Sequence, residues 1–483
     1  MKERVLIQGI VSEVTFPCKG KLMPTEDQPP IPEADSAAGI LYVAPKKQYG
    51  PMNVKNLLPG QTWLASTGQG GRKAKECRPI KLVKKADYEI EPPCPHADPE
   101  KEGCGGCLYQ TVPYEMQAEW KERMVKDLLA PVPGVSEAQW LPIVKSPASV
   151  AYRNKVEFSF GDEFKGGPLT LGMHKRGAFH DIVSTPDCVL VHEDVRMIAA
   201  ETERFFREAG LRQYSTYTGE GVLRHLVMRR SYANGGVLVN LVTTSKMGAY
   251  PELLEQWKQA VIACEIEGTI AGILQTTNDS VADVVQADRL DVLYGKPELT
   301  EELLGLSFRV FPFSFFQTNT KGAEKLYSIV REFAGNVSQK EVFDLYCGTG
   351  TIAQIMAAAG AKKVSGIEIV AEAVDAAREN ATLNHLDNCT FIAGDVLKEV
   401  EKLEGRPDLI ILDPPRDGIH PKALPKLLQF APKQFIYVSC KPTSLVRDLP
   451  AFVEAGYRIE KIQACDMFPM TPHTETVVSM TRE

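Results

Sequence analysis

Two reactive side chains in the last quarter of the chain lie at points where strands are expected to end or begin. Cys440 follows an apolar run at 435–439 and precedes Lys441 and a helix start. A thiol beside a lysine and near a helix N-terminus is expected to have a lowered pKa, which favours a nucleophile over a buried core cysteine. Glu475 precedes an expected last strand at 476–480, and its carboxylate could fold back toward the thiol. Spacing alone leaves a solvated glutamate as the alternative.

A glycine-containing loop resembles a nucleoside-binding turn. Asp344-Leu-Tyr-Cys-Gly-Thr-Gly-Thr follows an apolar strand and opens a helix, so its two glycines would let a ligand approach the backbone closely. Glu368 ends the next strand, where a carboxylate accepts hydrogen bonds from ribose hydroxyls. The loop lacks a third glycine and begins with an acid, which favours S-adenosylmethionine over NAD. Asp413, in Asp-Pro-Pro-Arg, ends another expected strand; a purely structural turn is the alternative.

Three cysteines crowd into fourteen residues, whereas the other eight of the 11 are scattered. The N-terminal segment shows no secretory signal, so we expect metal or nucleophilic roles rather than a disulfide framework. Four thiolates suit zinc or an iron–sulfur cluster, and spacing does not separate the two. The three clustered ligands are Cys94, Cys104 and Cys107; the leading fourth is Cys188, with Cys77 and His96 as competitors.

The C-terminal third alternates apolar strands with helical segments, which predicts an α/β, doubly wound, Rossmann-like parallel sheet. Ligands bind such sheets at the carboxyl ends of the strands, where the segments above fall. The expected strands are 341–346, 364–369, 409–413 and 435–439, and the expected helices are 352–359, 371–384, 422–430 and 445–455.

The preceding sequence predicts two further domains. Short apolar runs at 5–15 and 38–90 indicate a small β-barrel with a loop at 22–37, followed by a helix at 112–129. A mixed α+β central domain follows, mostly antiparallel, with strands at 155–160, 169–174, 223–230 and 236–243. The expected domains span 1–90, 91–310 and 311–483.

Charge is unevenly distributed along the 483 residues. The net charge is -7, but residues 1–90 hold 14 Lys or Arg against 9 Asp or Glu. Within 72–85 seven basic residues face one acid, a pattern that suits phosphate contacts as well as a solvated surface. No apolar run approaches the roughly 18 residues that span a bilayer. We therefore expect a cytoplasmic protein without a membrane partner.

Seven segments together resemble the S-adenosylmethionine-dependent RNA 5-methyluridine methyltransferases, most closely the 23S ribosomal RNA uracil-5-methyltransferases with an iron–sulfur cluster. The resemblance covers nearly the whole chain and is weakest around 22–37. The segments are Cys104-Gly-Gly-Cys-Leu-Tyr-Gln, Tyr152-Arg-Asn-Lys-Val-Glu-Phe-Ser, Phe313-Ser-Phe-Phe-Gln-Thr-Asn, the Asp344 loop, Asp413-Pro-Pro-Arg, Val438-Ser-Cys-Lys-Pro and Thr471-Pro-His-Thr-Glu.

The resemblance implies a role for each of these segments. Ribosomal RNA would be the partner of a monomer, bound in part by an N-terminal TRAM/OB-like barrel. Cys440 would be the nucleophile and Glu475 the base. The implied cofactor ligands are Gln317, Tyr346, Glu368 and Asp413; the implied 4Fe-4S ligands, with zinc less favoured, are Cys94, Cys104, Cys107 and Cys188; and candidate phosphate contacts are the basic residues at 72–85, Arg224, Arg229 and Arg230.

Other functions share parts of this pattern. A transfer-RNA uracil-5-methyltransferase would use the same catalytic set, and the cysteine cluster favours the ribosomal branch. A cytosine-5-methyltransferase is disfavoured because Asp413-Pro-Pro-Arg offers no Pro-Cys pair, and an NAD enzyme is disfavoured by the glycine loop. A non-catalytic RNA-binding or redox-sensing protein is disfavoured by the presence of Cys440 and Glu475.

Overall fold

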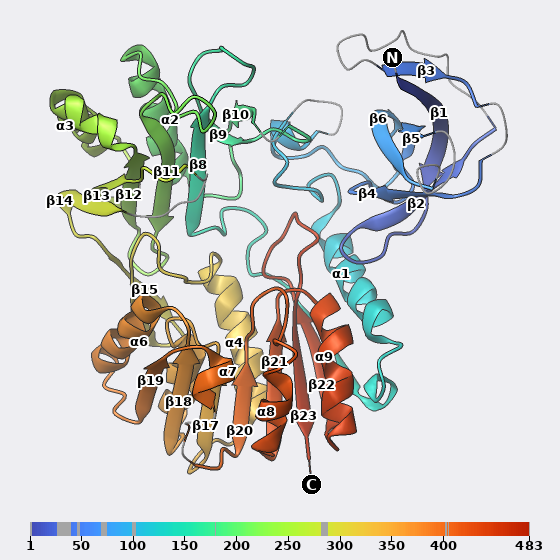
Figure 1. Cartoon of the computed structure of the whole chain (residues 1–483), viewed down its shortest axis with the longest axis vertical. Helices are drawn as coiled ribbons and strands as arrows, with labels where there is room; N and C mark the ends of the chain where they lie inside the picture. The colour runs from blue at the N-terminus through green and yellow to red at the C-terminus, as the bar shows by residue number, and fades with distance from the viewer. Residues whose placement is uncertain are drawn as a thin grey trace. The chain divides into compact units, whose positions relative to one another are not determined.

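The computed structural model describes residues 2–26, 40–45, 49–68, 75–98, 103–178, 180–281, 288–400, 403 and 405–482. Its chain divides into two compact units, which we call unit 1 and unit 2 (Figure 1). Unit 1 comprises Met1–Gly103, Cys107–Leu128 and Met470–Pro472, and unit 2 comprises Cys104–Gly106, Leu129–Pro469 and His473–Glu483. The predicted domain boundaries at 90 and 310 remain predictions.

Unit 1 is a curved sheet packed against a helix. The strands are β1 (Lys2–Val11), β2 (Lys19–Pro24), β3 (Ile40–Val43), β4 (Met52–Lys55), β5 (Thr62–Thr67) and β6 (Cys77–Lys84), in the order β4-β2-β1-β5-β6 with β3 beside β1. A bridge between Asn53 and Glu76 brings the two outer strands together, as in a barrel. Helix α1 (Tyr114–Leu129) adds Trp120 and Met124 to the core, as the helical pattern predicted.

The loop predicted at 22–37 begins later than expected. Strand β2 continues to Pro24, because Leu22 is buried in the core and pairs with Val11 of β1. Residues 27–37 lie outside the described part of the chain.

Unit 2 contains a seven-stranded sheet with two helices packed against it. Its strands are β8 (Lys155–Gly161), β9 (Thr170–His174), β10 (Ile182–Ser184), β11 (Leu223–Arg230), β12 (Gly236–Thr243), β13 (Thr269–Thr277) and β14 (Arg289–Gly295), in the order β10-β9-β8-β11-β12-β13-β14. All neighbours are antiparallel except β12 and β13, which agrees with the predicted mixed α+β region. Helices α2 (Glu193–Glu208) and α3 (Pro251–Ile262) bury their apolar faces in its core.

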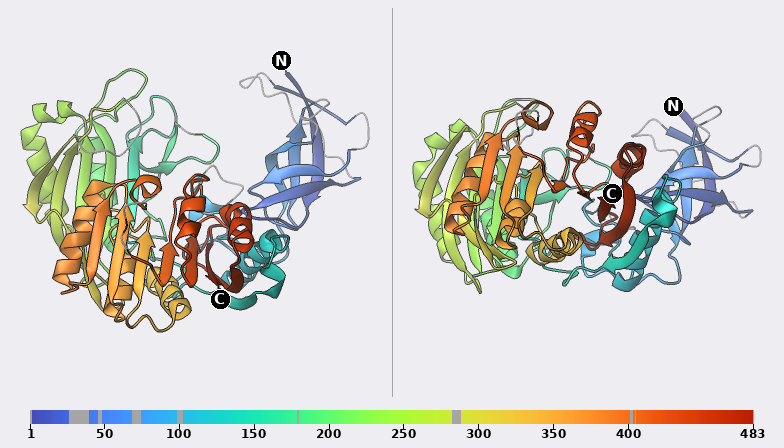
Figure 2. Two further views of the ribbon diagram at one scale, coloured as in Figure 1. Left: turned by 60° about the horizontal axis from the view of Figure 1, so that its bottom comes forward. Right: turned by 90° about the horizontal axis from the view of Figure 1, so that it is seen from below.

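The second sheet of unit 2 has eight strands in the order β19-β18-β17-β20-β21-β23-β22-β7. Figure 2 shows the C-terminal part of the chain, coloured gold to red, in two further views. They are β7 (Gln139–Val144), β17 (Glu341–Leu345), β18 (Lys363–Glu368), β19 (Cys389–Ala393), β20 (Leu409–Leu412), β21 (Gln434–Ser439), β22 (Arg458–Cys465) and β23 (Glu475–Thr481). The five from β19 to β21 are parallel, and the four strands predicted in this region are all among them. The associated helices are α4 (Thr320–Ala334), α5 (Thr351–Ala358), α6 (Ala371–Leu383), α7 (Val396–Glu399), α8 (Leu424–Gln429) and α9 (Thr443–Glu454).

The direction of β23, the source of β7 and a separate two-stranded hairpin are among the features that were not predicted. Strand β23 runs antiparallel to both neighbours, so its first residue, Glu475, lies at the end of the sheet where β21 finishes. Strand β7 comes from far earlier in the chain and pairs with β22. A hairpin of β15 (Leu299–Leu303) and β16 (Leu306–Val310) precedes the sheet and is held by α6, because Asn380 and Asn384 accept from its backbone N–H groups at 2.8 and 2.9 Å.

In the described part of the chain, no helix is long and apolar enough to cross a membrane.

Trp257 provides a test of the core beneath the seven-stranded sheet. Its ring is fully buried, stacks on Phe206 with centroids 5.9 Å apart, and donates from Nε1 to Thr202 at 3.2 Å. We expect Trp257→Ala to lower the free energy of unfolding by about 3–5 kcal/mol, because truncation leaves a cavity and an unpaired hydroxyl. Urea unfolding measures this. Tyr217→Ala, at a side chain that is 97% exposed, should leave the free energy of unfolding within about 0.5 kcal/mol of wild type. An equal loss of stability in both variants would contradict the assignment of Trp257 to the core.

Candidate active site

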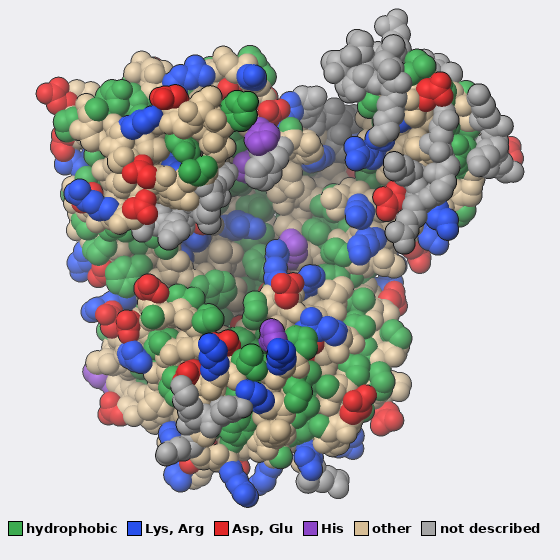
Figure 3. Space-filling view, viewed as in Figure 1, with side chains coloured by type: hydrophobic (Ala, Val, Ile, Leu, Met, Phe, Trp, Pro, Cys, Tyr) green, Lys and Arg blue, Asp and Glu red, His purple; other side chains and the backbone are tan. Residues whose placement is uncertain are grey.

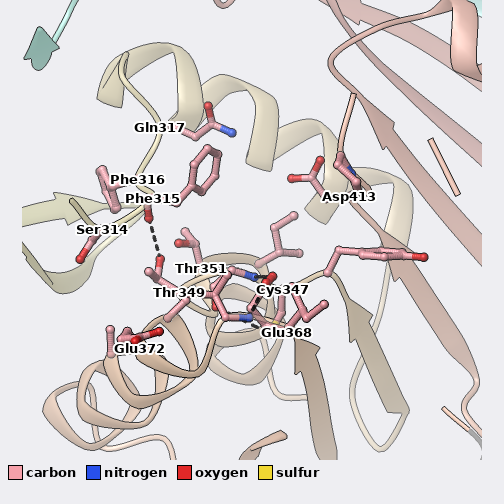
Figure 4. A pocket seen from close by; sticks show the side chains of 18 of the residues that line it. Ser314, Phe315, Phe316, Gln317, Cys347, Thr349, Thr351, Glu368, Glu372 and Asp413 are labelled. Atoms are coloured by element: carbon pink, nitrogen blue, oxygen red, sulfur yellow. Dashed lines mark hydrogen bonds between the residues drawn. The ribbon is translucent and has the colours of Figure 1, made fainter. Parts of the chain in front are cut away.

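A cavity of about 1490 Å³ opens at the carboxyl ends of β17, β18, β20 and β21 (Figure 4). It lies where the strand order turns from β17 to β20, the switch point at which open α/β sheets bind ligands. The volume exceeds the roughly 300–1,000 Å³ of a typical small-molecule pocket, which leaves room for a second group beside a cofactor. A space-filling view shows a hollow in unit 2 between its two sheets, with basic side chains near its margin (Figure 3).

The glycine loop connects β17 to α5, and its backbone conformation leaves no room for a side chain at Gly350. Gly348 and Gly350 have φ of 54° and 73°, and a Cβ on Gly350 would lie 2.6 Å from the Phe391 ring. Asp344 Oδ2 accepts from the Ala353 N–H at 2.8 Å, which ties the strand end to the first turn of α5. Its Oδ1 is buried without a hydrogen-bond partner among the described residues. One acceptor is therefore available for a ligand that brings a donor or a positive charge.

Glu368, at the end of β18, braces the same loop. Its two carboxylate oxygens accept from the Gly348 N–H at 3.0 Å and the Val370 N–H at 3.1 Å. A carboxylate has about four acceptor positions, so both oxygens retain capacity toward the cavity. Ile369 and Val370, which follow, are exposed apolar side chains on the cavity wall. A polar acceptor beside an apolar surface suits a ribose next to a flat base.

The chain between β16 and α4 forms another wall of the cavity. Gln317 lines it, and the buried Tyr327 hydroxyl of α4 hydrogen bonds Gln317. Phe315 is 65% exposed, and its carbonyl accepts from Thr349 Oγ1 at 3.4 Å (Figure 4). Nothing in the sequence pattern marked Tyr327, because it lies within an amphipathic helix, whereas Thr349 was visible in the glycine loop.

Cys440 and Glu475 come from adjacent antiparallel strands and line the same cavity. Ser439 pairs with Thr476, so each reactive residue lies one position beyond that pair, at the same end of the sheet. Burial raises the pKa of Glu475 to about 8, with Asp413 adding to the effect and Arg416 opposing it. Burial also raises the pKa of Asp413 to about 7.

The expected lowering of the Cys440 pKa is wrong. Burial, together with Glu475 and Asp413, raises the pKa of this thiol to about 11, and Arg416 opposes the rise. Burial is the largest cause of the rise, and the two carboxylates from other strands add to it. The Nζ of Lys441, the lysine next in sequence, lies 3.9 Å from the exposed Asp417.

All six residues implied as catalytic or cofactor-binding line this one cavity: Gln317, Tyr346, Glu368, Asp413, Cys440 and Glu475. Tyr346 has a left-handed backbone, with φ of 67°, directly after β17. Asp344 belongs with them, because burial, Asp413 and Glu368 raise its pKa to about 8. A cluster of buried acids with raised pKa values favours a cationic ligand.

Comparison with known proteins agrees with this geometry. A family model described as tRNA (uracil-5-)-methyltransferase matches residues 299–483. An RNA methyltransferase of Clostridium tetani is 48% identical over 92% of this chain and 95% of its own length. One of Caldanaerobacter subterraneus subsp. tengcongensis is 44% identical over 88% of this chain and 93% of its own length. The chain belongs to the RNA 5-methyluridine methyltransferase family.

Among solved structures, the crystal structure of a Pyrococcus abyssi tRNA (uracil-54, C5)-methyltransferase in complex with S-adenosyl-L-homocysteine has a TM-score of 0.72. It is 24% identical, and the match covers 98% of this chain and 99% of that one. The RNA methyltransferase described here therefore shares its fold over nearly the whole length.

Three arginines predicted to contact phosphate are engaged inside this methyltransferase instead. Arg224 is 4% exposed and donates to the carbonyls of Asn278 and Ser280. Arg229 is 3% exposed and donates to the carbonyls of Pro312 and Ser314. Arg230 donates from Nε to the buried Asp194 at 2.7 Å. They are structural because strand β11 buries the faces that carry them. Of the basic run at 72–85, Arg72 and Lys73 lie outside the described residues.

The proposed metal ligands are divided between the two units. Cys94 and Cys107 belong to unit 1, and Cys104 and Cys188 belong to unit 2. Within the described residues, no group of three or more His, Cys, Asp or Glu side chains is arranged to hold a metal ion. Cys77 is a poor competitor, because it is packed in the unit 1 core and burial raises the pKa of its thiol to about 12.

The acid cluster predicts an unusual pH dependence of stability. Asp344, Asp413 and Glu475 have raised pKa values in the folded protein, so the folded state binds more protons than the unfolded state above pH 4.5. Their contribution to stability is present at low pH and is lost as pH rises toward about 8. We expect the Tm of the protein without ligand to fall as pH rises from 5.5 to 8.5. Asp344→Asn should make that fall smaller, because asparagine does not ionise and still offers an acceptor to the Ala353 N–H.

Differential scanning calorimetry across this pH range measures the effect. Asp417→Asn is the matched control, because the Asp417 side chain is 97% exposed and should leave the slope unchanged. A wild-type Tm that rises with pH would contradict the raised pKa values of the three acids. An equal dependence of Tm on pH in wild type and Asp344→Asn would contradict the part given to Asp344.

Proposed function

We propose that this cytoplasmic, monomeric protein methylates carbon 5 of a uridine in 23S ribosomal RNA, with S-adenosylmethionine as the methyl donor. The observation that carries the proposal is the convergence of Cys440, Glu475 and the four cofactor-site residues on one cavity at the switch point of the sheet. The P. abyssi structure supports the cofactor, because a related fold binds S-adenosyl-L-homocysteine. The cysteine set favours ribosomal RNA over the transfer RNA named for that relative.

The residues present fit S-adenosylmethionine. Glu368 would accept from the ribose hydroxyls, with Ile369 and Val370 beside the adenine. Gln317, Tyr346 and Asp413 would hold the remainder, and the unpartnered Asp344 Oδ1 would face a donor or a cation. When bound, the cofactor supplies an activated methyl group on a positively charged sulfonium. That charge would oppose the effect of the acids on the Cys440 pKa and favour the thiolate.

Covalent catalysis explains why Cys440 and Glu475 lie side by side. Carbon 5 of uracil is a weak nucleophile, so the Cys440 thiolate would add to carbon 6, forming a C–S bond and moving the double-bond electrons into an enolate. Carbon 5 of the enolate would then take the methyl group as its bond to the sulfonium sulfur breaks, with the neutral thioether S-adenosyl-L-homocysteine as the leaving group. Glu475 would remove the carbon-5 proton as a carboxylate, and the released electron pair would re-form the C5–C6 double bond and expel the Cys440 thiolate.

The cavity also has to admit a base from structured RNA. Flipping a nucleotide out of its stack costs on the order of a few kcal/mol, which aromatic stacking offsets. Phe315, exposed on the cavity wall, and Phe468 near His473 are aromatic surfaces in reach of such a base. Arg416 is the cation at the mouth whose charge acts on Cys440 and Glu475. A phosphate of the flipped nucleotide would suit its side chain.

Transfer of a labelled methyl group to unmodified ribosomal RNA and to bulk transfer RNA tests the proposal. We expect 5-methyluridine in ribosomal RNA from wild type and none from Cys440→Ala. The matched control Cys264→Ala, at a partly buried thiol outside the cavity, should keep full activity. Glu475→Gln should lose about 10²–10⁴-fold in turnover and trap a protein–RNA adduct, because carbon 5 keeps its proton.

The distribution of label separates the alternatives. Label in transfer RNA alone would show that the substrate is transfer RNA, the kind of RNA named for the P. abyssi relative, and would reject ribosomal RNA. Label in neither RNA would favour a non-catalytic RNA-binding or redox-sensing role. Activity retained by Cys440→Ala would exclude the covalent route.

We also propose a 4Fe-4S cluster on Cys94, Cys104, Cys107 and Cys188, with zinc less favoured. Four thiolates have the chemistry for either metal. The Gly106 N–H donates to Cys104 Sγ at 3.3 Å, a contact that stabilises a ligand thiolate. No catalytic step passes through the cluster. The N-terminal sheet would be a TRAM/OB-like RNA-binding barrel, with Lys75, Arg78, Lys81, Lys84 and Lys85 as phosphate contacts.

Anaerobic purification followed by metal analysis tests the cluster. We expect about four iron atoms per chain and broad visible absorbance from wild type. Cys188→Ser should lose iron, whereas Cys77→Ser, at a thiol packed in the core, should keep it. One zinc per chain without iron, or iron lost only from Cys77→Ser, would reject this ligand set.

A further inference from the structure

The wall segment Pro312–Gln317 carries the cofactor-site glutamine but belongs to neither sheet. All residues of the segment line the cavity, and hydrogen bonds from neighbouring elements fix its backbone. On one side, Thr349 of the glycine loop donates to the Phe315 carbonyl at 3.4 Å. The other supports come from the seven-stranded sheet, through residues outside the assigned catalytic and cofactor set.

Arg229, at the end of β11, reaches into the segment. Its Nε donates to the Pro312 carbonyl at 3.1 Å, and its Nη2 donates to the Ser314 carbonyl. Both carbonyls belong to the part of the segment that carries Phe313 and Phe315 on the cavity wall. The guanidinium is 3% exposed, and its desolvation lowers the Arg229 pKa to about 10, an effect that Glu157 partly opposes. A buried cation that donates to two backbone carbonyls fixes their position strongly.

Asn154, which precedes β8, holds the far end of the same segment. Its Nδ2 donates to the Gln317 carbonyl and to Thr320 Oγ1, both at 2.8 Å. Its backbone N–H donates to the Thr318 carbonyl at 2.8 Å, and its carbonyl accepts from the Arg230 N–H. Residues at the ends of β8 and β11 therefore hold the backbone of this wall at Pro312, Ser314 and Gln317.

We propose that Arg229 is a positioning residue for the cofactor: by holding the Pro312 and Ser314 carbonyls, it places Phe315 and Gln317 where the cofactor binds. The inference rests on the proposed function for the identity of that cofactor. Its consequence is that the seven-stranded sheet, which carries no assigned catalytic residue, controls cofactor affinity. Losing Arg229 should weaken cofactor binding more than it slows the chemical step.

The same strand provides a matched control. Arg224 lies on β11, is equally buried, and donates to two carbonyls, those of Asn278 and Ser280, which do not line the cavity. Arg224→Met and Arg229→Met therefore both remove a buried guanidinium that donates to two backbone carbonyls; Arg224 also lies over the Tyr214 ring, 4.6 Å from its centroid. Titration calorimetry with S-adenosyl-L-homocysteine, with the Tm of each variant, compares them. Arg229→Lys is a second variant for use if Arg229→Met does not fold, because lysine keeps the positive charge and a hydrogen-bond donor group.

We expect Arg229→Met to weaken S-adenosyl-L-homocysteine binding about tenfold or more, the effect of one lost charged hydrogen bond. Arg229→Lys should fall between it and wild type, and Arg224→Met should bind within about twofold of wild type despite a similar loss of Tm. In methyl transfer, Arg229→Met should raise KM for S-adenosylmethionine more than it lowers kcat.

Equal binding by Arg229→Met and wild type, or equal weakening in the two methionine variants, would overturn the inference. Because ligand binding needs no RNA, these outcomes stand apart from failure of the proposed RNA substrate. A wild-type protein that binds no S-adenosyl-L-homocysteine would remove the cofactor from the proposed function and this inference with it.

Discussion

The short connection between β17 and α5 is the constraint on which the rest of the site depends. Asp344 ties the strand to the helix through the Ala353 N–H, and Glu368 ties the neighbouring strand to the Gly348 N–H. The connection fits only because Gly350 has no Cβ against Phe391 and adopts a left-handed backbone. Two acids from parallel strands are thereby fixed at one edge of the sheet, and the cavity forms around them.

That constraint has an electrostatic cost. Asp344, Asp413 and Glu475 are crowded at one edge, and burial raises the pKa of each. Burial raises the pKa of the Cys440 thiol as well, and Glu475 and Asp413 add to that rise. Under the proposed function, the positive charge of the cofactor would oppose the contribution of these carboxylates.

The sequence predicted the parallel strands and the residues at their ends because periodicity and strand-end acids are local signals. It failed for Cys440, where the neighbouring Lys441 suggested a lowered pKa; burial in the folded protein raises that pKa instead, and the carboxylates of two other strands add to the rise. It failed for Arg229 because a basic residue on a strand gives no sign of whether that face is buried. The antiparallel β23, which brings Glu475 beside Cys440, depends on long-range pairing that no local pattern encodes.

The burial of Arg229 also bears on how the two sheets of unit 2 work together. A phosphate contact needs an accessible guanidinium, whereas the buried guanidinium of Arg229 donates hydrogen bonds to the carbonyls of Pro312 and Ser314. Neutral side chains could fill the same space, but they would leave both carbonyls without a charged donor and the wall free to shift. Asn154 repeats the arrangement at Gln317. Because both sets of hydrogen bonds come from residues at the ends of β8 and β11, a substitution that displaces those strand ends would also displace the wall of the cavity.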